Sequence, residues 1–313
     1  MKFEIYSFTL PSKLAGTTLS GKVYTPIVRA NAKAIFQIAH GMAEHIERYD
    51  EFCSFLASNG YAVFIHDHAG HGKSAPSDEE LGFFGEENGW KTLVEDCRTV
   101  NQFAVKEFPD RPIIFFGHSM GSFIARAYTR LYSANLSGAI YCGTSGANPA
   151  AGIAIGLADM IARSKGSHYH SEFINTLAFG AYNKKIKPAR TDFDWLTKDE
   201  AIVDKYVADP YCGFLFTACG YRDLFTVLKA VSGKKWYQGL PKRLPVFLIA
   251  GECDPVGEYG KGVKQVYRDL KKTGHTDVSI KLYAGDRHEI LNELDRQSVM
   301  EDIVKWADEK TAR

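Results

Sequence analysis

Ser119 lies between two glycines in the stretch FFGHSMGSF. An apolar run, Ile113 to Phe116, comes before it, and residues 122 to 132 carry apolar side chains at helical spacing. This pattern predicts a sharp turn from a buried strand into a helix. A side chain at Gly117 or Gly121 would then collide with neighbouring backbone, and the turn would present the serine hydroxyl as a nucleophile.

A serine hydroxyl is a poor nucleophile until a base removes its proton, so a histidine and a carboxylate are needed nearby. His288 follows the strand-like IKLYAGDR, and Asp254 follows the strand-like VFLIAGEC. The carboxyl ends of parallel strands meet at one edge of a sheet, where ligand groups gather. We therefore predict a catalytic triad of Ser119, Asp254 and His288, in which His288 is the base and Asp254 holds its second ring nitrogen.

Other residues of the same types are less well placed for this chemistry. Ser145 lacks paired glycines, and His275 precedes its strand. Glu252 stands within or at the end of a strand, and Asp286 lies only two residues from His288. We predict that Asp286 shapes the loop.

The negative oxygen of a tetrahedral intermediate needs backbone N–H donors. One is predicted at Met120, the residue after the nucleophile. The second is predicted at Met42, because His40 and Gly41 follow the strand-like AIFQIA and let the backbone pass close to the serine. A simple turn before a helix is the alternative interpretation of this loop.

The elements that must position these residues follow a regular rhythm. Two alternating segments, Lys2–Leu10 and Thr18–Tyr24, predict an antiparallel pair of strands. Strand-like and helix-like segments then alternate, which predicts an α/β fold with a mainly parallel sheet and helices on both faces. The strand-like segments are Ala34–Ala39, Ala62–His66, Ile113–Phe116 and Gly138–Cys142, and the helix-like segments are Tyr49–Ser58, Trp90–Phe108 and Ser122–Leu131.

The rhythm stops between residues 143 and about 233, where no clear buried strand is present. It returns with LPVFLIAG, the helix-like GKGVKQVYRDLKKTG, the strand DVSIKLYAG and a helix from Ile290 to Glu309. We predict a core of residues 1–142 and 234–313 and an inserted helical cap, or lid, of residues 143–233. Its apolar residues either line an acyl channel or form its own core: Ile153, Ile155, Leu157, Phe173, Phe179, Trp195 and Phe214.

Composition narrows the range of partners. The chain has 313 residues, 45% of them hydrophobic, and a formal charge of +1, so neither nucleic acid nor an anionic membrane is a predicted partner. Its six cysteines lack C-x-x-C spacing, and its first residues lack the apolar run of a secretory signal. We expect a cytoplasmic protein without an integral membrane segment that acts on a small molecule; its oligomeric state is open.

Five stretches together resemble one family: HGMAEHIERYDEF, HDHAGHGKS, GHSMGS, GECDPV and GDRHEI. They are similar to the monoacylglycerol lipase and lysophospholipase group of α/β-hydrolases, also grouped with serine aminopeptidases of the S33 type. The resemblance implies the same triad and oxyanion donors. It also implies that Glu44 and Arg48 help shape the polar alcohol end of the pocket, with a plain structural salt bridge as the alternative. Ala43 stands where the family often has glycine.

Two other motifs were weighed in HDHAGHGKS. His66, His68 and His71 resemble the H-x-H-x-D-H motif of metallo-hydrolases, but Gly70 occupies the position of the aspartate. GKS resembles the end of a phosphate-binding loop whose first glycine is replaced by Asp67. We expect neither a metal nor a phosphate here, and interpret the segment as a tight structural turn.

The sequence therefore predicts a serine hydrolase that cleaves carboxylic esters of lipid type, monoacylglycerols or lysophospholipids, through an acyl-enzyme without a cofactor. An aminopeptidase or amidase of the same fold is an alternative, since a triad also cleaves amides. It would need a carboxylate for the substrate ammonium, and Glu172, Asp192 and Asp194 are candidates. A non-catalytic binding module is the third hypothesis.

Overall fold

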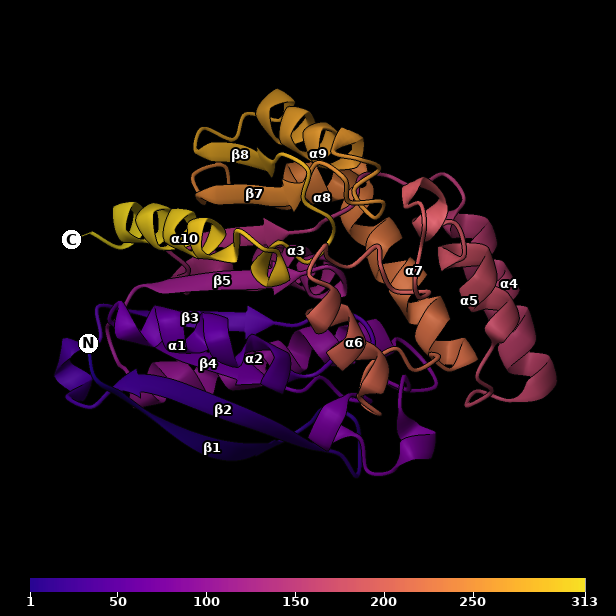
Figure 1. The fold of residues 1–313 in the computed structure, drawn as a ribbon. Coiled ribbons are helices and arrows are strands. Elements are labelled where there is room, and N and C mark those ends of the chain that lie inside the picture. Colours follow the sequence, from indigo (N-terminus) through magenta and orange to yellow (C-terminus); the bar gives the residue numbers. More distant parts are fainter. Residues whose placement is uncertain (313) are drawn as a thin grey trace.

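The computed structural model describes residues 1–312. An eight-stranded sheet forms its centre, in the order β1-β2-β4-β3-β5-β6-β7-β8 (Figure 1). β1 pairs antiparallel with β2 and β2 antiparallel with β4, while all other neighbours are parallel. The predicted antiparallel pair and mainly parallel sheet are confirmed. The strands are β1 Phe3–Pro11, β2 Thr18–Pro26, β3 Ala34–Ala39, β4 Tyr61–His66, β5 Ile113–His118, β6 Gly138–Cys142, β7 Val246–Gly251 and β8 Val278–Tyr283.

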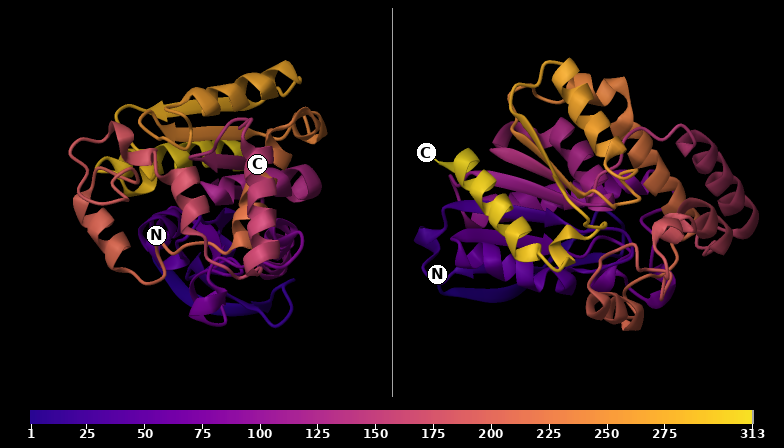
Figure 2. Two further views of the ribbon diagram at one scale, coloured as in Figure 1. Left: turned by 90° about the vertical axis from the view of Figure 1, so that its right-hand side faces the viewer. Right: turned by 45° about the horizontal axis from the view of Figure 1, so that its top comes forward.

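Helices cover both faces of this sheet (Figures 1 and 2). β3 is buried along its whole length, and its alternate residues point to opposite faces. Phe36 and Ile38 pack with α1 (Asp50–Ser58) and α10 (Arg296–Thr311). The opposite face packs against α2 (Gly89–Glu107), α3 (Met120–Tyr132) and α9 (Lys261–Lys272). Short 3₁₀ helices are η1 Arg29–Asn31, η2 Ile46–Tyr49, η3 Gly72–Ser74, η4 Asp78–Glu80, η5 Ser133–Asn135, η6 Tyr182–Lys185 and η7 Ile290–Asn292.

Five further helices lie between β6 and β7, and no strand does within this described segment. Figure 1 shows α4 to α7 beyond the arrowheads of the parallel strands. α7 packs against the core, because its buried side chains share one hydrophobic cluster with those of α2 and α3. The helices are α4 Ala151–Lys165, α5 Glu172–Phe179, α6 Glu200–Ala208, α7 Ala218–Ser232 and α8 Lys234–Gly239.

Two sequence predictions need comment. The last helix was predicted from Ile290, but α10 begins at Arg296. Residues 290–292 form η7, and the extended backbone of Glu293 (φ −77°, ψ 168°) separates it from α10. The Glu293 carboxylate accepts the backbone N–H groups of Arg287 (2.8 Å) and Lys198 (3.1 Å) and so ties this stretch to another loop. Within residues 1–312 no helix is long and apolar enough to cross a membrane, and the cytoplasmic location stays a prediction.

The turn around Ser119 has the predicted strand-to-helix form. Ser119 lies between the last residue of β5 and the first residue of α3. Its φ of +53° and ψ of −121° form a conformation that L-residues rarely adopt. A Cβ on Gly121 would strike the carbonyl oxygens of Ala39 and His40, and one on Gly117 would lie 2.8 Å from the Cβ of Ala125. Gly121 therefore lets α3 approach the end of β3, and Gly117 lets it approach β5.

We expect Gly121→Ala to destabilise the protein by about 3 kcal/mol, because the new methyl group meets backbone that cannot rotate away. Gly156→Ala is the matched control, because a Cβ added to this helical glycine has nothing within 4 Å. This variant should be more stable than the wild type by about 0.5–1 kcal/mol. Urea unfolding of both variants measures the difference. Equal stability of the two would refute the steric explanation.

Candidate active site

Two of the predicted catalytic residues are in contact. His288 and Asp254 follow β8 and β7, are fully buried, and place Nδ1 3.0 Å from Oδ1. The distance between Nδ1 and Oδ1 suits a hydrogen bond, but the angle at these atoms does not. The pairing of His288 with Asp254 therefore rests on their distance. Asp254 Oδ1 also accepts the N–H of Val256 at 2.8 Å, which orients the carboxylate. With Nδ1 beside Asp254, Nε2 of His288 remains for another partner.

The turn after β6 adjoins both Ser119 and His288. The N–H of Ser119 donates to the Cys142 carbonyl at 2.9 Å. The next residue, Gly143, has φ +58°, and a Cβ there would lie 3.0 Å from Cε1 of His288. The structure therefore places Ser119, Asp254 and His288 at the same edge of the sheet.

The less favoured candidates have other partners. The Asp286 carboxylate forms an ion pair with Lys198 at 2.7 Å, which agrees with the loop-shaping role predicted for it. The ring of His275 contacts two backbone carbonyls, those of Leu270 (3.0 Å) and Leu240 (3.2 Å).

The loop after β3 runs beside Ser119. A Cβ on Gly41 would lie 2.6 Å from Glu44 Oε1 and 3.2 Å from the Cβ of Ser119, so a side chain here would displace the Glu44 carboxylate and press against the serine. Met120 is the first residue of α3. Within the described part of the chain, the N–H groups of Met42 and Met120 have no hydrogen-bond partner. Both predicted oxyanion donors thus lie close to the serine in sequence or in space.

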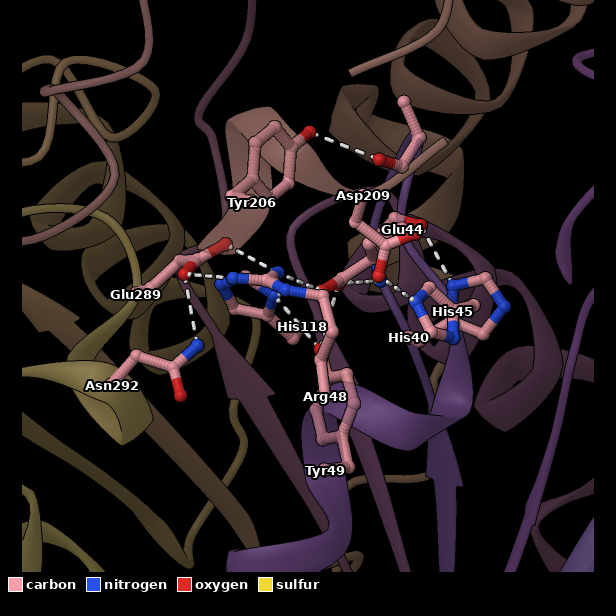
Figure 3. A network of polar contacts seen from close by, with 12 residues as sticks. His40, Glu44, His45, Arg48, Tyr49, His118, Tyr206, Asp209, Glu289 and Asn292 are labelled. Atoms are coloured by element: carbon pink, nitrogen blue, oxygen red, sulfur yellow. Dashed lines mark hydrogen bonds and ion pairs between the residues drawn. The ribbon is translucent and has the colours of Figure 1, made fainter. Parts of the chain in front are cut away.

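A buried cluster of charges links this loop to the loop of His288. Arg48 donates two hydrogen bonds to Glu289, at 2.7 and 2.6 Å, and pairs with Glu44 (Figure 3). Glu44 Oε1 accepts the N–H of Gly41 and the hydroxyl of Tyr49. The loop after β3 and the loop after β8 are therefore joined through Arg48.

The charges of this cluster shift one another's titration. Burial alone would raise the pKa of Glu44, but the hydrogen bond with His118 and the positive charge of Arg48 hold that pKa well below its usual range. Burial opposes protonation of His118, yet its hydrogen bond with Glu44 and the nearby negative charges leave its pKa raised. The pKa of Glu289 is likewise lowered, against the effect of burial, by Arg48. Glu44 and Glu289 are thus stabilised as carboxylates.

This arrangement bears on the role that the resemblance implied for Glu44 and Arg48. Both side chains are engaged by the ion pairs of the cluster, and together with His118 and Glu289 they line a small hollow. A pocket-shaping role for them stays a prediction. Glu289 and His118 were not singled out from the sequence, although each stands next to a predicted catalytic residue, which was the available signal.

The motif HDHAGHGKS has a structural role in this structure. The Asp67 carboxylate accepts the backbone N–H groups of Ile46 (2.9 Å) and Lys73 (3.0 Å). Gly72 has φ +45°, and a Cβ there would strike that carboxylate. The segment is therefore a tight turn, as interpreted, and it also ties down the residues that follow the loop after β3.

The three histidines of the motif separate into two environments. Ligand atoms of His66 and His68 lie within 4.8 Å of each other and of the Cys97 sulfur, whereas His71 Nε2 accepts the N–H of Ala43 at 3.3 Å. Burial lowers the pKa of His66 and of His71 to about 4, and burial raises the pKa of the Cys97 thiol. The side chains of His66, His71 and Cys97 are therefore uncharged in the folded protein near neutral pH.

Part of the cap also contacts the candidate site. The ring of Trp195 lies 5.2 Å from that of His288, centroid to centroid. The N–H of Glu289 donates to the carbonyl of Leu196 at 2.7 Å. The segment before α6 is thus paired with the loop that carries His288.

Comparison with known proteins identifies the family and the fold of this chain. Residues 30–295 match the family model described as serine aminopeptidase, S33. This chain belongs to that family. A carboxyl esterase structure from Bacillus coagulans is 32% identical, covers 98% of this chain and 99% of its own, and superposes with a TM-score of 0.92. The sheet and helices described above are those of the α/β-hydrolase fold.

Curated relatives extend the comparison over most of the chain. A monoacylglycerol lipase from Mycolicibacterium smegmatis is 27% identical over 94% of this chain and 94% of its own length. A monoglyceride lipase from Rattus norvegicus is 26% identical over 90% of this chain and 84% of its own. The resemblance noted from five short stretches therefore extends over nearly the whole sequence, and the chain is a carboxylic ester hydrolase of this family.

We expect Arg48→Met to lower the free energy of unfolding at pH 7 by about 3–5 kcal/mol, because it leaves two buried carboxylates without their cation. The loss should shrink toward pH 5. With Arg48 present the pKa of Glu289 is depressed, so the stabilisation from its carboxylate is present above about pH 4.5. Without Arg48, burial favours the protonated form of Glu289, and the stability of that form is lost as pH rises.

The matched control is Arg163→Met, which removes an exposed helical pair with Asp159 and should cost less than about 0.5 kcal/mol at either pH. Urea unfolding at pH 5 and pH 7 measures both variants. A loss for Arg48→Met that equals the control, or that is independent of pH, would contradict a buried and mutually stabilised ion cluster.

Proposed function

We propose that this chain hydrolyses lipid esters, monoacylglycerols or lysophospholipids, through an acyl-enzyme formed on Ser119. Membership of the family and the esterase and lipase names of its relatives support ester hydrolysis. The observation that carries the catalytic assignment is the 3.0 Å contact between His288 and Asp254 at the sheet edge that also bears the strained turn of Ser119.

In the proposed reaction His288 takes up and releases a proton twice, once when the acyl-enzyme forms and once when water cleaves it and the proton returns to Ser119. The Oγ of Ser119 attacks the ester carbonyl carbon while Nε2 of His288 takes the hydroxyl proton, and Asp254 stabilises the resulting imidazolium. The N–H groups of Met42 and Met120 stabilise the oxyanion. His288 then gives its proton to the leaving alcohol oxygen. Water, activated by the same histidine, hydrolyses the acyl-enzyme and releases the fatty acid.

We further propose that the cap, residues 143–233, is a lid that selects the acyl group. Its helices α4 to α7 lie beyond the carboxyl ends of the parallel strands (Figure 1). Of the apolar cap residues considered in the sequence, Phe179 and Phe214 pack against the main core cluster, while Ile153 and Phe173 are 77% and 63% exposed. The first two therefore contribute to packing between cap and core, and the last two form an outer apolar surface.

The family model's description keeps amide hydrolysis as a second candidate. An aminopeptidase needs a free carboxylate for the substrate ammonium. The Asp194 carboxylate is already used, because it accepts the N–H of Thr191 (3.2 Å) and its hydroxyl (2.8 Å). A panel of monoacylglycerols, lysophospholipids, aryl esters and aminoacyl arylamides decides between the candidates, and we expect cleavage of the esters.

We expect Ser119→Ala to lower kcat on a monoacylglycerol by about four or more decades, because the nucleophile of a cooperating triad is lost. Ser145→Ala, which removes the serine lacking paired glycines, should leave kcat within about twofold. A fluorophosphonate should label the wild type at Ser119, as read by mass spectrometry. Near-normal turnover by folded Ser119→Ala would refute the acyl-enzyme, and a wild type inert toward every substrate would favour a binding module.

We expect Phe173→Asp/Leu177→Asp to lower the rate on emulsified monoacylglycerol about tenfold, because these residues of α5 are 63% and 64% exposed and offer apolar contact to a lipid surface. Turnover of a soluble aryl ester should be unchanged. Ser164→Asp, on the exposed surface of α4, adds charge without removing apolar area and is the control. Equal losses on both substrates would show that the double change damages the active site instead.

A further inference from the structure

Ala43, in the loop after β3, has a backbone conformation that needs external support. Its φ is +49°, in the left-handed region that costs an L-residue about 1–2 kcal/mol. Residues held in such conformations persist only where the surrounding structure fixes them. The contacts that fix Ala43 matter for the site because the proposed oxyanion donor, Met42, immediately precedes it.

The core holds one side of this residue and the cap holds the other. The N–H of Ala43 donates to His71 Nε2 at 3.3 Å. Its carbonyl oxygen accepts two hydrogen bonds, from the hydroxyl of Tyr206 at 2.9 Å and from the N–H of Gly213 at 2.9 Å. Tyr206 lies in the last turn of α6, and Gly213 follows that helix.

The same part of the cap makes two further contacts with the loop. His45 Nε2 lies 2.8 Å from Asp209 Oδ2, and the guanidinium of Arg48 lies over the ring of Tyr206, 4.7 Å from its centre (Figure 3). The ring of Tyr206 is buried, with 6% of the residue exposed. Residues 206–213, which we call the cap clamp, are therefore attached to the loop after β3 at four points.

Relaxation of Ala43 to a negative φ would change the direction of the peptide groups on either side of it. Gly41 is held by Glu44 and by its close approach to Ser119, so the change would fall on the residues between. Met42 is the residue between Gly41 and Ala43. The Met42 N–H lies in the peptide group between Gly41 and Met42, which turns when the compensating rotation reaches ψ of Gly41. Its direction is thus coupled to the conformation that the cap clamp stabilises.

We propose that the cap clamp positions the oxyanion loop, with Tyr206 as a positioning residue that acts through the Ala43 carbonyl. The proposal rests on the function proposed above. It gives the cap a second role besides covering the substrate: a cap that moves away from the core releases the loop, so the oxyanion site is complete only when the cap is in place.

The first test is Tyr206→Phe, which keeps the ring and removes only the hydroxyl. Loss of a direct oxyanion donor costs about 10²–10³ in kcat. Loss of one of the two hydrogen bonds to the Ala43 carbonyl should therefore lower kcat on a soluble aryl ester by about tenfold, with KM changed less than about twofold. Tyr283→Phe is the control, because it removes a hydroxyl hydrogen bond of 3.0 Å from another buried tyrosine, distant in sequence, and should leave kcat unchanged.

The second test repeats Tyr206→Phe in an Ala43→Gly background. Glycine adopts positive φ without penalty, so the loop should need its anchor less, and the loss in kcat should fall below about threefold. A hydroxyl that only stabilises the fold would lower kcat equally in both backgrounds. That result, or a Tyr206→Phe enzyme as active as Tyr283→Phe, would overturn the clamp. A wild type without esterase activity would instead overturn the proposed function.

Discussion

The close approach of α3 to the end of β3 is the steric constraint on which the candidate site depends. Gly121 faces the carbonyl oxygens of Ala39 and His40 with no room for a side chain, and Gly41 comes close to the Cβ of Ser119. These contacts bring the N-terminus of α3 and the loop after β3 to one place. The backbone of Ser119 is strained as a result, and the packing of the helix on the sheet keeps it in this conformation.

Buried charge connects the loops that the sheet leaves separate. Arg48 binds Glu44 in the loop after β3 and Glu289 in the loop after β8, two positions 245 residues apart in sequence by their numbers. Both carboxylates are stabilised in the interior by the guanidinium that they share, and Glu44 also by its hydrogen bond with His118. The cluster therefore restricts the relative positions of the loop with Met42 and the loop with His288.

The cap contacts both of these loops. Trp195 and Leu196 adjoin the residues after β8, while Tyr206 and Gly213 bond the carbonyl of Ala43. A cover that merely excludes water would not need such specific polar contacts. In the function proposed here the core provides the nucleophile and the cap holds part of the surrounding loop, so that access of the substrate and the geometry of the site would be coupled.

Local pattern was sufficient to predict most of the fold. The glycines around Ser119 predicted the turn, and the apolar runs predicted the strands of the sheet, because steric and periodic rules act within short segments. The same runs showed that Asp254 and His288 each follow a strand. The ion cluster, the anchors on Ala43 and the late start of α10 join residues far apart in sequence. No local pattern encodes which distant partner a buried charge or carbonyl meets. Tertiary packing alone decides that, because it determines which groups lose water together and must satisfy one another.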